Sequence, residues 1–322
     1  MAVEAMVRHG HDSEVHAWID WYRQRLDEPP RGLTPVTSEN WQDALGDTTR
    51  VADWTTFMLR EVQLRPWRDV LVEWWPRLLP GIIAGATHGV IRVGHAVRTL
   101  PVEAETLNGP RLEEFAHALA YWAARWRRLE VPTPPRSGKV GASAALAAVP
   151  SVAEQGISIT HRLNQLTGYT QWSSALDALR TPETPEQAAD LLATLTDEAV
   201  YDYLRRGHAN PVMLVHASTA PTAVLRTLPV LPRELWIPSL DAAWLATAAI
   251  TAAYRNTEAP SEEIAMVNAQ TGDAHETFDR AVQHRDEHAV KFADAALDAY
   301  ERTGSSDALA AATRATLMIK KG

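Results

Sequence analysis

The sequence contains no cysteine among its 322 residues. This absence excludes disulfide bonds, thiolate metal sites and cysteine nucleophiles. A long hydrophobic run is also lacking, because the longest, AAWLATAAITAAY, is too short to cross a bilayer and follows Asp241 directly. The first twenty residues show no apolar core behind a basic start, so no secretory signal is visible. We therefore expect a soluble, cytoplasmic protein that does not bind membranes.

Positive charge is scarce relative to negative charge. Lysine and arginine number 31 against 40 aspartates and glutamates, which gives a net charge of −9 with histidine neutral. An acidic surface without a basic run argues against nucleic acid as a partner. Strand-like alternation, glycine-rich phosphate loops and fixed-period repeats are missing as well.

Apolar residues recur at helical spacing along nearly the whole chain, as Val15, Trp18, Ile19 and Tyr22 do. This pattern predicts an all-α fold of about a dozen helices, forming a single compact domain over residues 1–322. The segment 130–143, rich in proline, glycine and serine, is expected to be a long loop.

Tryptophan and histidine are abundant, with twelve residues of each. Tryptophans usually fill a protein core, but as a group they would also line a pocket for a flat aromatic ligand. In a chain without cysteine, the imidazole of histidine is the first candidate as a metal ligand.

The stretch HRDEHAVK, residues 284–291, contains the His-x-x-Glu-His pattern of inverted zinc peptidases. On one continuous helix, His284, His288 and Lys291 would share a face, whereas Glu287 would point away from it. A peptidase also needs a further carboxylate ligand on another helix, and only 34 residues follow His288. We therefore disfavour the peptidase, while the solvated face of an ordinary helix remains an alternative.

Other apolar helices carry three further histidines. His88 and His95 lie seven residues apart, two turns along one face, and His216 lies in PVMLVHASTAPTAVLRTLP. Each of them, taken alone, is as readily a hydrogen-bonded core residue. Taken together with His288, they indicate a buried metal site.

Lys291 adds a requirement to this site. A protonated lysine repels a cation, so a lysine beside metal ligands must be neutral or chemically changed. A carbamylated lysine would supply a carboxylate-like oxygen ligand. The alternatives are that Lys291 extends to solvent or pairs with Asp294.

Four segments together resemble the questin oxidase family, from about residue 1 to 302. They are PWRDVLVEWWPRLLPGIIAGATHGVIRVGHAVRTL, EFAHALAYWAARW, MLVHASTAPTAVLRTLPVLP and DEHAVKFADAAL. The resemblance implies an all-α oxidoreductase of secondary metabolism, either a dioxygenase or a Baeyer–Villiger-type monooxygenase. Its substrates would be O₂ and a polycyclic aromatic polyketide such as an anthraquinone, with O₂ activated at a histidine-bound non-haem Fe(II). Fungal members are linked with NADPH, yet this chain has no dinucleotide fingerprint, so a requirement for NADPH stays open.

The resemblance also implies roles for individual residues. His88, His216, His288 and Lys291 match as metal ligands, and His95 and His284 would orient a ligand, bind metal or transfer protons. An Asn-His pair is expected upstream of the segment that MAVEAM matches, so either translation starts earlier or the site has one ligand fewer. The alternative is a non-catalytic helical protein that sequesters an aromatic natural product. Under either function, the sequence leaves open whether the protein forms a homodimer.

Overall fold

The computed structural model describes residues 1–26, 28, 30–101, 109–131, 137–156 and 158–322. These residues form seventeen α-helices and no β-sheet, with one isolated bridge between Val140 and Leu179. The helices are α1 (Ala2–Arg8), α2 (Val15–Arg23), α3 (Trp41–Ala44), α4 (Val51–Leu64), α5 (Trp67–Leu78), α6 (His88–Thr99), α7 (Pro110–Arg125), α8 (Ala142–Ala147), α9 (Ile159–Asn164), α10 (Thr170–Ala178), α11 (Pro185–Arg206), α12 (Pro211–Thr227), α13 (Trp236–Tyr254), α14 (Ser261–Gln270), α15 (Ala274–His284), α16 (Glu287–Thr303) and α17 (Ser306–Met318). The all-α prediction is confirmed, with more and shorter helices than expected. The loop expected at 130–143 lies partly outside the described residues and ends where α8 begins.

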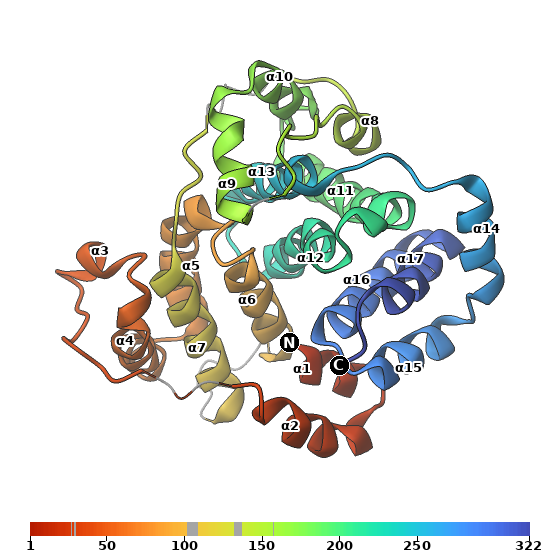
Figure 1. Ribbon diagram of the computed structural model, residues 1–322. Coiled ribbons are helices and arrows are strands. Elements are labelled where there is room, and N and C mark those ends of the chain that lie inside the picture. The colour runs from red at the N-terminus through yellow and green to blue at the C-terminus, as the bar shows by residue number, and fades with distance from the viewer. Residues whose placement is uncertain (27, 29, 102–108, 132–136, 157) are drawn as a thin grey trace.

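Helix α12 lies at the centre of the molecule (Figure 1). It packs against α6, α11, α13 and α16. Helix α6 packs in turn on α7, and α7 on α4, while α16 packs on α15 and α17. Because α12 contacts both α6 and α16, the three helices that carry His88, His216 and His288 come together around it.

Two glycines allow α6 to approach its neighbours closely. A methyl group at Gly94 would lie 2.7 Å from Cα of Ala223 in α12, and one at Gly89 would lie 2.6 Å from the ring of Trp122 in α7. Both distances are shorter than van der Waals contact, so only glycine fits at either position.

The chain breaks between α15 and α16. Arg285 adopts a left-handed conformation with φ of 63°, and the side chain of Asp286 accepts hydrogen bonds from the backbone N–H groups of His288 and Ala289. An aspartate in this position caps a new helix, because it satisfies N–H groups that have no partner within the helix. The expectation of one continuous helix was therefore wrong, and His284 does not share a helix face with His288.

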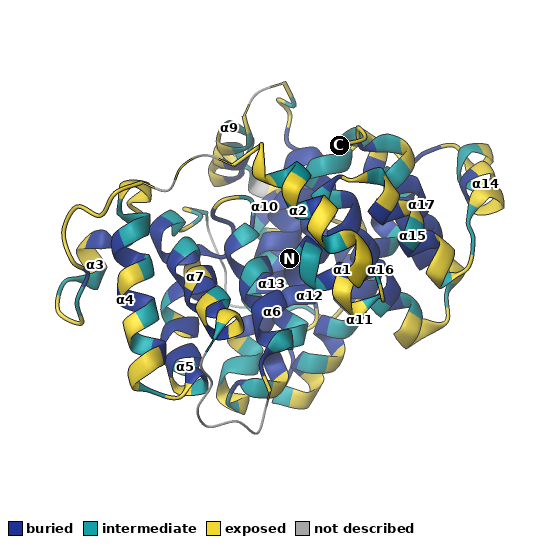
Figure 2. Cartoon of the chain, turned by 90° about the horizontal axis from the view of Figure 1, so that it is seen from below, coloured by how far each residue is buried: buried dark blue, intermediate teal, exposed yellow. Residues whose placement is uncertain are grey.

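Tryptophan side chains fill the core, as expected of single tryptophans. Trp54, Trp74, Trp75, Trp122 and Trp244 are almost completely buried. In Figure 2, the central helices α12 and α13 are largely buried, and the peripheral helices are half exposed. Within the described residues, Arg233–Tyr254 is the one segment long and apolar enough to cross a membrane. Most of this segment is buried against its neighbours, which is the environment of a core helix in a soluble protein.

Candidate metal centre

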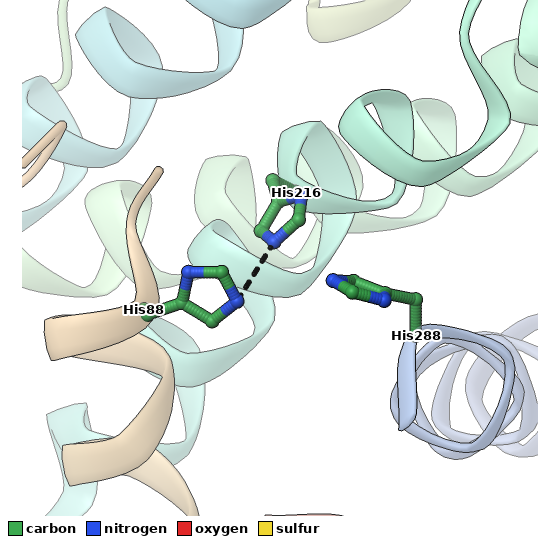
Figure 3. A group of neighbouring side chains, drawn as sticks. All are labelled: His88, His216 and His288. Carbon is green, nitrogen blue, oxygen red and sulfur yellow. Dashed lines mark hydrogen bonds between the residues drawn. The ribbon is translucent and has the colours of Figure 1, made fainter. Parts of the chain in front are cut away.

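Three histidines from distant parts of the chain meet between α6, α12 and α16 (Figure 3). One ring nitrogen from each of His88, His216 and His288 lies within 4.8 Å of the others. The Nε2 atoms of His88 and His216 are 3.2 Å apart, and the ring centroid of His288 is 5.3 Å from that of His216. The structure thus brings together three of the residues that the sequence singled out.

The other ring nitrogens of His88 and His216 face backbone carbonyls. Nδ1 of His88 lies 2.6 Å from the carbonyl oxygen of Gly85, and Nδ1 of His216 lies 3.2 Å from that of Met213. A carbonyl only accepts hydrogen bonds, so each Nδ1 donates its proton and each neutral ring keeps a lone pair on Nε2. Two lone pairs then face each other across 3.2 Å. They repel unless one ring takes up a proton or a cation lies near both.

His288 is oriented in a similar way, but by a carboxylate. Its Nδ1 lies 3.2 Å from Oδ1 of Asp286. Burial opposes ionisation of Asp286, yet the hydrogen bond from His288 lowers the pKa of that carboxyl below its usual value. A histidine that donates one N–H to a carboxylate or carbonyl is the usual arrangement around protein-bound metals.

Asp286 is a candidate site residue that the sequence analysis did not identify. On one continuous helix it would lie off the face that His284 and His288 share, so helical spacing assigned it no role. The available signal was that an aspartate before Glu287 and a run of helix-forming residues is typical of an N-cap.

Burial keeps His88 and His216 neutral. It lowers the pKa of His88 to about 4, and the charge of Lys291 contributes to the same effect. The pKa of His216 lies well below its ordinary value. Burial is the larger cause, and the charge that His88 carries when protonated is the second. Neutral imidazole is the form that binds metals. His88 also lies in the first turn of its helix, where the helix dipole disfavours an imidazolium.

Lys291 is buried one turn after His288. Its residue is 2% exposed, and among the described residues its Nζ has no hydrogen-bond partner. Burial lowers the pKa of this amine to about 8, although the charges of Glu287 and Asp286 act in the opposite direction. Three imidazoles beside a buried amine that is easily deprotonated are a donor set that fits a divalent metal ion.

His95 lies in a separate cluster rather than in the triad. Its Nδ1 is 2.6 Å from Oε2 of Glu4, which also forms an ion pair with Arg98. Arg98 and Arg226 in turn contact the fully buried Asp294. Glu4, His95 and Asp294 are close enough to hold a cation, but the two guanidinium groups already neutralise both carboxylates. We interpret this cluster as an ion-pair network that joins α1, α6, α12 and α16.

His284 also lies outside the triad. It ends α15, and among the described residues its buried Nε2 has no hydrogen-bond partner. The break at Arg285 separates it from the helix that presents His288. Helix geometry therefore does not support the predicted catalytic role of His284, which stays a prediction.

A cavity of about 320 Å³ lies beside the loop that precedes His88. Gly85, whose carbonyl accepts the hydrogen bond from His88, is one of its lining residues. The lining combines aliphatic side chains with three arginines and the polar residues Glu130, Thr160, Asn164 and Thr167, and no tryptophan belongs to it. The expectation of a tryptophan-lined pocket was thus wrong for this cavity, because the large indole rings pack in the core instead.

Residues 4–130 match a family model described as questin oxidase-like. This match confirms the family resemblance over that part of the chain. Of the three triad histidines, it includes His88 but neither His216 nor His288. The chain matches no curated protein and no solved structure.

Proposed function

We propose that this chain, which is questin oxidase-like over residues 4–130, is an oxygenase that acts on a polycyclic aromatic polyketide such as an anthraquinone. The family match implies an oxidoreductase for anthraquinone-like substrates. The observation that supports a metal-dependent reaction is the pair of Nε2 lone pairs that face each other between His88 and His216, with His288 beside them. His88, His216 and His288 would bind Fe(II).

When bound, Fe(II) would supply the site at which O₂ is activated for ring cleavage or oxygen insertion. The protein holds the three imidazoles in their metal-binding tautomers through the carbonyls of Gly85 and Met213 and the carboxylate of Asp286. Burial within α12 also shields the ring of His216 from bulk water.

Lys291 would complete the ligand set as a carbamate. In this step the neutral Nζ attacks CO₂, an N–C bond forms, and the nitrogen releases one proton. The product carries a negative charge where the ammonium carried a positive one. A lowered pKa favours the reaction, because more of the amine is neutral near neutral pH. We further propose that His95 and His284 orient ligands or transfer protons. A requirement for NADPH and the formation of a homodimer stay open.

Metal analysis of the purified protein tests this function. Protein purified without chelator, or reconstituted anaerobically with Fe(II), should contain stoichiometric iron. His288→Ala should lose that metal while its helical circular dichroism stays unchanged. Failure of the reconstituted protein to retain metal, or stoichiometric metal in His288→Ala, would refute the assignment.

The cavity beside His88 also favours a second candidate, a protein that sequesters an aromatic natural product without turning it over. The two functions differ in their need for metal. Tight binding of an aromatic ligand by a protein that never retains metal would support sequestration.

A further inference from the structure

The cavity beside His88 is bounded by the loop 81–87, the residues that follow α7, and helix α9. In Figure 1, α9 lies over the N-terminal end of α6, where His88 is located. The aliphatic side chains of Ile83, Leu129, Ile159 and Leu163 form part of its wall. Its volume of about 320 Å³ lies near the lower limit of small-molecule sites, which span roughly 300–1,000 Å³.

Three arginines give this cavity a charge opposite to that of the whole protein. Arg125, Arg127 and Arg128 line it together with a single acidic residue, Glu130. The chain as a whole has a net charge of −9. None of the three arginines forms an ion pair with a described carboxylate. Their charges are therefore available to a ligand.

Arg125 joins the charged side of the cavity to the histidine triad. Its guanidinium carbon lies 4.3 Å from the ring centroid of Tyr121, a cation–π contact that holds it in place. A methyl group at Gly85 would lie 3.4 Å from Cδ of Arg125 and 3.5 Å from Oη of Tyr121. The arginine stem thus packs against the residue whose carbonyl accepts the hydrogen bond from His88.

We propose that this cavity is the substrate subsite and that it selects flat aromatic molecules carrying an anionic oxygen, as a carboxylate or a phenolate. The ring system would lie against the aliphatic wall. The anionic group would bind the guanidinium groups, which donate paired hydrogen bonds to such oxygens. This inference rests on the proposed function in one respect, the position of the substrate's aromatic ring next to His88. Recognition of the substrate's anionic oxygen by the arginines needs no metal and is independent of that function.

Binding measurements on the metal-free protein test the proposal. The probes are anthraquinone-2-carboxylate and the neutral anthraquinone-2-carboxamide, measured by isothermal titration calorimetry. We expect the carboxylate to bind at least about tenfold more tightly, since charge-assisted hydrogen bonds are roughly twice as strong as neutral ones. This preference should decrease as salt is added, because Arg127 and Arg128 are exposed and salt screens the charges of exposed groups.

The variant Arg127→Gln/Arg128→Gln should lose most of the preference for the carboxylate. Lys320→Gln/Lys321→Gln is the matched control, since it removes the same charge from two adjacent exposed residues that do not line the cavity. Both variants should keep the circular dichroism spectrum of the parent. Equal binding of the two probes, binding of neither, or an unchanged preference in Arg127→Gln/Arg128→Gln would overturn the proposal. Because no metal is present, these outcomes are independent of the metal analysis that tests the oxygenase function.

Discussion

Asp286 contacts both the side chain and the backbone of His288. Its Oδ1 lies 3.2 Å from Nδ1 of the His288 ring and 2.8 Å from the backbone nitrogen of the same residue. The carboxylate that starts α16 therefore also sets the tautomer and direction of the His288 imidazole. The substitution Asp286→Asn removes the negative charge behind the His288 ring but keeps the cap, because asparagine caps helices as well as aspartate does.

Asp286→Asn should weaken metal affinity while leaving stability nearly unchanged. We expect a loss of about 10–100-fold, which is typical when the hydrogen-bond partner of a ligating histidine is mutated. A competition assay with a chelator of known affinity measures this effect. Asp273→Asn is the control, because Asp273 caps α15 through the backbone N–H of Glu276. An equal loss of affinity in both variants would show that the effect comes from the loss of any negative charge at a helix start, not from the partner of His288.

Lys291 should carry a carbamate in the active protein. Protein equilibrated with ¹³C-bicarbonate is expected to show one carbamate resonance in its ¹³C NMR spectrum, and the resonance should vanish on unfolding or acidification. Lys291→Arg should lack it, because a guanidinium does not react in this way and stays protonated. Lys291→Ala should lose activity and regain part of it with bicarbonate and a short carboxylic acid. A spectrum identical to that of Lys291→Arg would exclude the modification.

The stability of the metal-free protein should fall as pH is lowered from 6.5 towards 4. Burial lowers the pKa of His95 from 6.5 to about 4, although the hydrogen bond with Glu4 opposes this. Between these two values the unfolded state binds a proton that the folded state does not, so protons favour unfolding. Hydrogen bonds from His95 and Arg98 outweigh burial and lower the pKa of Glu4 to about 2, so its stabilising contribution is lost only below its ordinary value of 4.5.

Urea unfolding at pH 7, 5.5 and 4.5 measures this dependence. His95→Gln should flatten the decrease, since it removes one of the groups that titrate differently in the two states. His275→Gln should not, because that side chain is 76% exposed. Identical slopes in His95→Gln and the parent protein would contradict the role assigned to His95.

The loop before α6 holds two non-glycine residues in the left-handed region, Ala86 with φ of 52° and Thr87 with φ of 65°. An L-residue in this region is strained by about 1–2 kcal/mol relative to the right-handed one. Ala86→Gly should therefore raise the free energy of unfolding by about 1 kcal/mol. Ala144→Gly, at an exposed helical position in α8, should lower it by about 1 kcal/mol. If both variants are destabilised alike, Ala86 is not strained.

Periodicity alone predicted the all-α fold, because an amphipathic helix needs only local spacing of apolar residues. The sequence predicted that His88, His216 and His288 lie close together, because each lies in an apolar helix, where a polar ring requires a partner. The sequence did not predict the left-handed turn at Ala86 and Thr87, because neither alanine nor threonine favours such a conformation. The pairing of His95 with Glu4 joins residues 91 positions apart, and local sequence carries no information about it.

The triad histidines are separated by 128 residues between His88 and His216 and by 288 − 216 = 72 residues between His216 and His288. No short fragment contains more than one of them, and the region 4–130 that matches the family model contains only His88. A metal ion held by all three would thus act as a long-range cross-link between three widely separated regions of the chain. Metal retention would then report global folding, and partial unfolding of any one of these three regions would release the ion.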